Sequence, residues 1–152
     1  MRAFWYFAHI AGYSIWIGAA LAAMVLGIAS KREPANASGT ASRLHMSLYP
    51  TLIGPGAILS LVSGLFLTLQ LYNRVTAVGL SQWLMAMQGL GLLASLIVIV
   101  FALPTASKLS RLDPERDPDL YPPLKKRLVL VGMGSGILAM LALLTGALYR
   151  YG

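Results

Sequence analysis

Hydrophobic positions form four long runs that are separated by shorter polar stretches. The runs cover residues 4–29, 48–72, 80–104 and 127–149. Each is long enough to cross a bilayer core of about 30 Å, which requires roughly 20 helical residues. Because a backbone in lipid must satisfy its own hydrogen bonds, we expect helices. The pattern predicts an all-α integral membrane protein with a single four-helix domain over residues 1–152.

Composition supports the same class. Hydrophobic residues make up 57% of the chain and charged residues 11%, against roughly 45 to 50% apolar residues in a soluble domain. The first run follows Arg2 and resembles a secretory signal, but it is longer than the roughly 7 to 15 residues of a signal core. We expect it to remain as a transmembrane helix.

The charged residues predict the orientation. Basic residues concentrate in the first and third connections: Lys31, Arg32, Arg43, Lys108, Arg111, Arg116, Lys125, Lys126 and Arg127. The other side holds only Arg2, Arg74 and Arg150. Cytoplasmic loops of membrane proteins carry the excess of Lys and Arg, so both termini are predicted outside a bacterial cytoplasmic membrane. With short connections, this gives an up-down-up-down bundle. The net charge of +7 then indicates a lipid surface as partner, with no nucleic acid.

Small residues and prolines suggest how the helices pack. Three groups of small residues recur at helical spacing: Ser14, Gly18 and Ala22; Gly56, Ser60 and Gly64; Gly132 and Gly136. Such faces let helices approach closely in lipid. Packing within the bundle is the favoured interpretation; the other is room for a flat cofactor, for which the GMGSG run at 132–136 is the best candidate. Pro50 and Pro55 are expected to bend or break the second helix after an interfacial helix.

Few side chains are suited to chemistry. The chain has no cysteine and two histidines, and the interiors of the apolar runs contain no Asp, Glu, Lys or Arg. His9 lies within the first run, where an imidazole is either a metal ligand or hydrogen-bonded to a neighbouring carbonyl. His45 is expected at the cytoplasmic surface beside Arg43, roughly 20 to 30 Å from His9, so the two should not share an ion.

Two methionines are expected near the depth of His9. Met85 and Met87 in the third helix carry thioethers, which suit haem iron or Cu(I) but also fill apolar gaps. Tyr13 and Trp16 follow His9 by four and seven residues and share its helix face, as a cofactor wall or as packing. Gln70, Gln88 and Thr145 are predicted near the same layer.

Two short motifs carry a family resemblance. The run HIAGYSIWIG, with His9, Gly12, Trp16 and Gly18, and the run PGAILSLVSG, with Pro55 and Gly64, are similar to small bacterial four-helix membrane proteins. That group includes the CopD-type copper-resistance membrane domain and the HemJ-type protoporphyrinogen oxidases. The HemJ-type resemblance implies haem b and a functional first-helix histidine, matched by His9. Its third-helix lysine, in a WLxxK-like pattern, is replaced in WLMAM by Met87, which argues against protoporphyrinogen oxidase activity.

The sequence therefore predicts a haem b-binding membrane protein with a redox or porphyrin-related role near the outer face. His9 is the expected axial ligand, with Met87 or Met85 as the second, and Tyr13 and Trp16 beside the cofactor. Two alternatives stay open. One is a non-catalytic accessory subunit that packs in a membrane complex or homodimer, and the other is copper handling by His9 and the methionines.

Overall fold

The computed structural model describes residues 2–29, 44–75, 81–112 and 116–151. Throughout these ranges the regular structure is helical, and four helices are long and apolar enough to cross a membrane. They are α1 (Arg2–Ala29), a second span (Leu44–Leu71), a third span (Gln82–Leu109) and α6 (Tyr121–Tyr151). The predicted all-α class with four candidate transmembrane helices is confirmed for this part of the chain. The predicted loop residues Lys31, Arg32 and Arg43 lie outside the described residues, as does most of the second connection.

The second and third spans each contain one π-helical turn. In the second span, η1 (Tyr49–Ile53) leads into α3 (Gly54–Val75). In the third, α4 (Gln82–Ile97) is followed by η2 (Val98–Ala102) and then by α5 (Leu103–Leu109). Each span therefore remains helical from end to end, with one widened turn.

A proline explains each widened turn. The amide of Gly54 donates to the carbonyl of Tyr49, five residues back, and Pro55 follows directly. Leu103 closes η2 in the same way before Pro104. A proline ring would strike the carbonyl four residues back in a regular α-helix, and a wider turn moves that carbonyl aside. The second helix is thus widened rather than broken. A Cβ placed on Gly54 would lie 2.8 Å from Leu103 Cδ2, so the two turns are neighbours.

Two helix ends extend beyond the apolar runs. α6 begins at Tyr121 instead of residue 127, and the third span ends at Leu109 instead of residue 104. Pro122 and Pro123 fall in the first turn of α6, where a missing amide costs no intrahelical hydrogen bond. These prolines lie in the first turn of the helix, whereas the apolar run predicted that the helix begins at residue 127.

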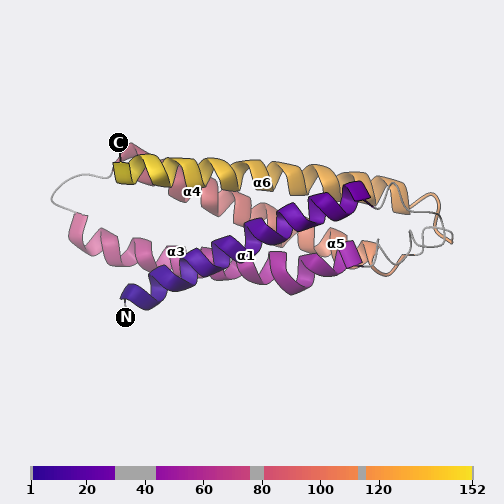
Figure 1. Ribbon diagram of the computed structural model, residues 1–152, viewed down its shortest axis with the longest axis horizontal. Coiled ribbons are helices and arrows are strands. Elements are labelled where there is room, and N and C mark those ends of the chain that lie inside the picture. Colours follow the sequence, from indigo (N-terminus) through magenta and orange to yellow (C-terminus); the bar gives the residue numbers. More distant parts are fainter. Residues whose placement is uncertain (1, 30–43, 76–80, 113–115, 152) are drawn as a thin grey trace.

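The first pair of helices consists of α1 and α3, which cross in opposite directions (Figure 1). Trp5 stacks on Phe66 near one end, with ring centroids 4.2 Å apart. Near the other end, a Cβ placed on Gly27 would lie 3.3 Å from Cε1 of His45, which precedes α3 in the same span. The chain direction is therefore antiparallel over the whole pair.

The second pair consists of α4 and α6, which lie along one another on the other side of the bundle (Figure 1). Met87 lies against Gly146, and Gly91 faces Ala142. These two contacts again run in opposite directions along the two helices. The N and C labels lie at the same end of the molecule in Figure 1.

A close backbone approach joins Gly12 of α1 and Gly56 of α3. A Cβ on Gly12 would lie 2.7 Å from the backbone nitrogen of Ser60, and one on Gly56 would lie 2.8 Å from that of Trp16. Glycine is needed at both positions because any side chain would separate the backbones. The contact confirms the Gly56, Ser60 and Gly64 face predicted from the sequence, since Gly64 also meets α1 through His9.

The prediction that the small residues of α1 pack against another helix of the bundle is wrong. Ser14 and Ala22 are exposed, and a Cβ on Gly18 would meet no described atom of another helix within 4 Å. The inward side of α1 instead carries Trp16 and Ala19, which are 2% and 5% exposed. Spacing identified a face of small residues but could not tell which way it turned.

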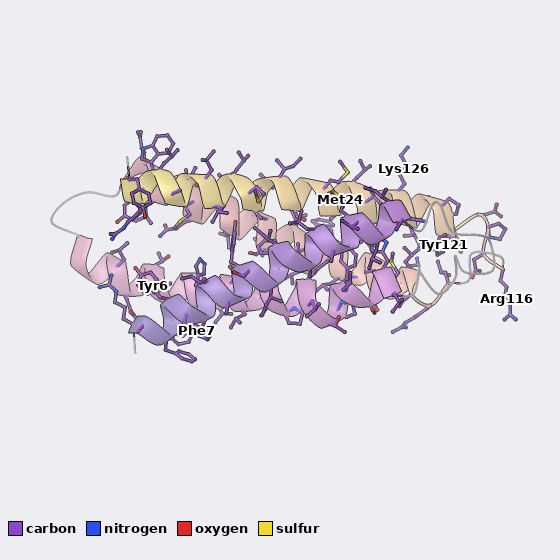
Figure 2. All side chains as sticks on the ribbon, viewed as in Figure 1. Tyr6, Phe7, Met24, Arg116, Tyr121 and Lys126 are labelled. Atoms are coloured by element: carbon purple, nitrogen blue, oxygen red, sulfur yellow. The ribbon has the colours of Figure 1, made fainter. Side chains whose placement is uncertain are left out.

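The outer surface is apolar along the spans and basic at one end. Phe7 and Met24 are 71% and 54% exposed and point away from the bundle (Figure 2). Arg116 and Lys126 lie at the end opposite the two termini (Figure 2). An apolar belt of this kind is suited to lipid, where exposed aliphatic side chains are not penalised.

Candidate functional site

His9 lies between α1 and α3 and forms a hydrogen bond across the two helices. Its Nδ1 is 2.9 Å from the backbone carbonyl oxygen of Ser60. A carbonyl only accepts, so Nδ1 carries the hydrogen, and Nε2 of the neutral imidazole keeps its lone pair. Of the two readings left open by the sequence, the hydrogen bond to a carbonyl is present. It does not exclude the other, because metal-ligating histidines characteristically use one ring nitrogen in this way.

Ser63 supports the same ring nitrogen. Its Oγ lies 3.3 Å from Nδ1 of His9 and donates to the carbonyl of Leu59 at 2.5 Å. Because the hydroxyl proton is used on Leu59, the oxygen is left to accept part of the Nδ1 hydrogen. Ser60 and Ser63 are both buried, at 4% and 0% exposure. The tautomer of His9 is therefore held by two buried groups of α3.

Gly64 makes room for the imidazole. A Cβ on Gly64 would lie 3.0 Å from Cε1 of His9 and 3.3 Å from Nδ1. The Nδ1 and Cε1 edge of the ring thus faces α3. Nε2, which is bonded to Cε1, is not among the ring atoms within 4 Å of the Gly64 Cβ position. Gly64, one of the residues in the PGAILSLVSG motif, therefore contacts the ring of His9.

Tyr13 and Trp16 continue the site along α1. The ring of Tyr13 lies 6.2 Å from that of His9 and 5.9 Å from that of Trp16. Its hydroxyl donates to the carbonyl of Ala139 in α6. Trp16 is buried beside Gly56. The structure thus groups three of the predicted site residues on one helix, and Tyr13 connects them to the second helix pair.

The two methionines lie elsewhere. Met87 packs against α6, where a Cβ on Gly146 would be 2.8 Å from its Sδ. Met85 is 50% exposed on α4. Met87 therefore belongs to the α4 and α6 pair, and its thioether fills the notch at Gly146. Met85 lies on the outer surface of the bundle, within a candidate membrane span.

Gln88 connects the second helix pair to the seat of His9. Its amide nitrogen donates to Oγ1 of Thr68 at 3.0 Å, and Thr68 donates to the carbonyl of Gly64 at 2.8 Å. Two hydrogen bonds thus join α4 to the glycine under His9. Hydrogen bonds between transmembrane helices are worth on average about 0.6 kcal/mol. The sequence placed Gln88 near this depth, but it predicted no contact of His9 or Gln88 with Ser60, Ser63 or Thr68.

The GMGSG run does not form an open, glycine-lined surface along its length. Ser135 is buried at 3% exposure and donates to the carbonyl of Gly132. A Cβ on Gly132 would lie 3.1 Å from the hydroxyl of Tyr49, whereas Gly134 and Gly136 have open space around them. One side of the run therefore packs in the bundle and the other faces outward.

The prediction that His45 lies at the surface is wrong. It is buried, at 7% exposure, with its ring against Gly27 and 6.1 Å from the ring of Tyr49. Gly27 is 18 residues beyond His9 on α1, or about 27 Å along the helix axis at 1.5 Å per residue. The two histidines are therefore far apart, although His45 is buried at the start of the second span.

The residues present limit which cofactors the protein can hold. Across residues 2–29, 44–75, 81–112 and 116–151, no group of three or more His, Cys, Asp or Glu side chains is placed to bind a metal ion. A bare ion at His9 would lack a full set of such ligands. Haem iron needs fewer protein ligands, because the porphyrin occupies four positions and the protein supplies the axial ones. One imidazole with a fixed tautomer suits that arrangement.

The fold defines a multi-pass membrane protein in which one histidine of α1 contacts two buried serines of α3. No protein-family model, curated protein or solved structure matches the chain.

Proposed function

We propose that the chain is a haem b-binding integral membrane protein with a redox or porphyrin-related role near the outer membrane face. The observation that carries this is the hydrogen bond from Nδ1 of His9 to the carbonyl of Ser60 at 2.9 Å. It assigns the proton to Nδ1 and orients the ring, so that Nε2 would be the nitrogen that binds haem iron. Haem would supply one-electron chemistry, and the protein would hold it and exclude water.

The second axial ligand would be Met87 rather than Met85. A thioether is an established partner of histidine in haem proteins. Met87 is partly buried against Gly146, and Met85 is 50% exposed. Ligation by Met87 would require its thioether to leave the contact with Gly146, and methionine has three rotatable bonds for such a change. Tyr13 and Trp16 would then line the same site from α1.

The proposed topology is up-down-up-down with both termini outside a bacterial cytoplasmic membrane. Basic residues of the third connection lie at the end opposite the termini, among them Arg116 and Lys126 (Figure 2). Arg2 and Arg150 belong to the end that carries the termini. The excess of positive charge marks the cytoplasmic side. His9, eight residues from the first residue, then lies near the outer face.

An absorption spectrum of the purified protein tests the haem proposal. Full-length protein is extracted in mild detergent, supplied with haem b and freed of excess haem. A Soret band is expected, and His9→Ala should lose it. Phe7→Ala removes an equally large side chain from the lipid-facing side of the same turn, and it should keep the band. Wild-type protein that binds no haem would refute the proposal, and copper bound in stoichiometric amount would replace it with copper handling.

A second candidate function is that of an accessory subunit without its own cofactor. The exposed face formed by Ser14, Gly18 and Ala22 favours it, because small residues are typical of contacts between transmembrane helices. A membrane complex or a second copy of the chain would cover that face. Replacing Gly18 by Leu should then release the partner during purification in mild detergent, while Gly134→Leu should retain it. A monomer without partners would exclude this role.

A further inference from the structure

The start of α6 carries a run of positive charge, and no acidic residue lies on the same helix. Lys125, Lys126 and Arg127 follow one another in its second turn, and the segment 121–151 contains no Asp or Glu. The acidic residues of the preceding connection all fall between positions 113 and 119. Side chains on the same helix therefore do not balance these three cations.

One of the three cations lies against the bundle, and the other two are exposed. Nζ of Lys125 is 5.9 Å from the ring centroid of Tyr121, within the range of a cation–π contact, and Tyr121 is 8% exposed. Lys126 and Arg127 are exposed. Lys126 points away from the bundle at the end opposite the termini (Figure 2). Two adjacent basic side chains therefore face the surroundings of the bundle.

An apolar stripe continues from Lys126 along the outer face of α6. Leu130, Met133 and Ile137 follow Lys126 by four, seven and eleven residues, which is the spacing of one helix face. These three side chains are 61%, 56% and 59% exposed. The buried residues of α6 lie on the opposite face of the helix. The stripe is therefore an outward surface with basic residues at one end.

The length of this stripe matches the thickness of one leaflet. Ile137 is eleven residues beyond Lys126, or about 17 Å along the helix axis at 1.5 Å per residue. One leaflet contributes half of a hydrocarbon core of roughly 30 Å. An acyl chain that lies along Leu130, Met133 and Ile137 therefore places the phosphate of its lipid at the level of Lys126 and Arg127.

The two exposed cations determine which headgroup suits this position. An ammonium binds phosphate as a point charge, and a guanidinium binds it through two parallel hydrogen bonds. A zwitterionic headgroup brings its own cation, which the two basic side chains repel. A headgroup with a net negative charge has no such cation. The position therefore favours an anionic phospholipid over a zwitterionic phospholipid with the same acyl chains.

We infer that the outer face of α6 from Lys126 to Ile137 binds one anionic phospholipid of the leaflet at the end opposite the termini. Lys126 and Arg127 hold the phosphate, and Leu130, Met133 and Ile137 contact an acyl chain. The inference depends on the membrane-spanning class of the chain and is independent of any haem at His9. It specifies a binding site on one helix, where the net charge indicated only a lipid surface.

The lipid selectivity of the purified full-length chain tests this inference. Delipidated protein in mild detergent is equilibrated with equal amounts of phosphatidylglycerol and phosphatidylcholine that have identical acyl chains. Native mass spectrometry then counts the lipids that remain bound. Wild type is expected to retain one phosphatidylglycerol in preference to phosphatidylcholine. One basic residue near an anionic headgroup changes affinity about fivefold, so Lys126→Gln and Arg127→Gln should each lower the ratio of the two bound lipids by that factor.

Variants at the same end of the molecule separate a defined site from a diffuse positive surface. Lys108→Gln and Arg111→Gln remove exposed cations at the end of the third span and should keep the wild-type ratio. An equal loss in these two variants would overturn the site on α6. Equal retention of both lipids by wild type would also overturn it.

A soluble headgroup tests the part played by the apolar stripe. Glycerol 3-phosphate carries the phosphate without acyl chains, and it should not displace bound phosphatidylglycerol at equal concentration. Displacement would show that the phosphate alone is bound and would overturn the contact of Leu130, Met133 and Ile137 with an acyl chain.

Discussion

His9 donates its Nδ1 hydrogen to the carbonyl oxygen of Ser60 at a distance of 2.9 Å, across 51 positions of sequence. The contact sets the tautomer of an imidazole that the sequence places within an apolar helix. It also fixes the rotation of α1 relative to α3, because only one face of each helix can bring these groups together. The same few residues therefore determine both the orientation of the His9 ring and the packing of α1 on α3.

Gly64→Ala should weaken haem binding without preventing it. The added Cβ would lie 3.0 Å from Cε1 of His9, so the ring must shift by a few tenths of an ångström and its hydrogen bond to Ser60 must lengthen. Disturbing such a supporting contact costs roughly 10- to 100-fold in metal affinity. Haem titration followed by absorbance measures the change. Gly134→Ala has open space around it and should bind like wild type; equal weakening in both variants would contradict the argument.

Gly12→Ala should destabilise the α1 and α3 pair. Its Cβ would lie 2.7 Å from the backbone nitrogen of Ser60, and backbone cannot move aside as a side chain can. Overpacking of this kind costs about 1 to 3 kcal/mol. Reversible unfolding in detergent, followed by circular dichroism, gives the free energy of unfolding. Gly18→Ala adds the same methyl group to the open side of α1 and should be neutral or slightly stabilising, since alanine favours a helix over glycine.

Tyr13→Phe should lower stability modestly and leave the haem ligand in place. The variant loses the hydrogen bond to the carbonyl of Ala139 and keeps the ring. Interhelical hydrogen bonds in membranes contribute about 0.6 kcal/mol on average and at most about 1.7. The same unfolding measurement applies. Tyr6→Phe serves as control, because Tyr6 is 48% exposed and its ring lies 5.7 Å from the Arg2 guanidinium. A larger loss in Tyr6→Phe than in Tyr13→Phe would be inconsistent with the structure.

Met87→Leu should change the spin state of the haem if Met87 is the second axial ligand. Leucine keeps the volume and removes the sulfur, so the iron would lose one ligand and become high-spin. Electron paramagnetic resonance of the oxidised protein distinguishes the two states. Met85→Leu alters a side chain that is 50% exposed and should leave the spectrum unchanged. An unchanged spectrum in Met87→Leu would assign iron ligation to His9 without Met87.

The absence of cysteine from the chain permits a direct test of orientation. Single-cysteine variants at Lys126 and Arg150 place one thiol at each end of α6, and both residues are exposed. A membrane-impermeant maleimide added to intact bacteria should label Arg150→Cys only. Labelling of Lys126→Cys alone would reverse the proposed topology. The cysteine-free parent gives the background.

The apolar runs were sufficient to predict the four helices, because long uncharged segments have only one economical structure in lipid. Helix ends were less predictable, since Pro122 and Pro123 are compatible with a loop and with a first helical turn. The face of α1 was predicted wrongly for a related reason. Periodicity identifies which residues share a face, as with Ser14 and Gly18, but the partner helix decides which face turns inward.

Only the part of the predicted site that lies on α1 is found together in the structure. Tyr13 and Trp16 lie near His9 because they follow it on the same helix. Ser60 and Gly64 could not be recognised as its partners, because their contact depends on how two distant segments cross. His45 was assigned to the surface, since its position beside a loop concealed that it lies within a helical span.

The two π turns divide their spans into halves with different helical phase. Each turn accommodates one residue more than an α-helix would, so the residues on either side are rotated by about 100° relative to an uninterrupted helix. Tyr49 and Ile53 of η1 are buried, as are Val98 and Ala102 of η2, so both widened turns lie in the core. Deleting one residue from either turn would turn one half of that helix away from its neighbours while leaving the composition nearly unchanged. The length of these two segments, as much as their chemistry, determines which side chains face the centre of the bundle.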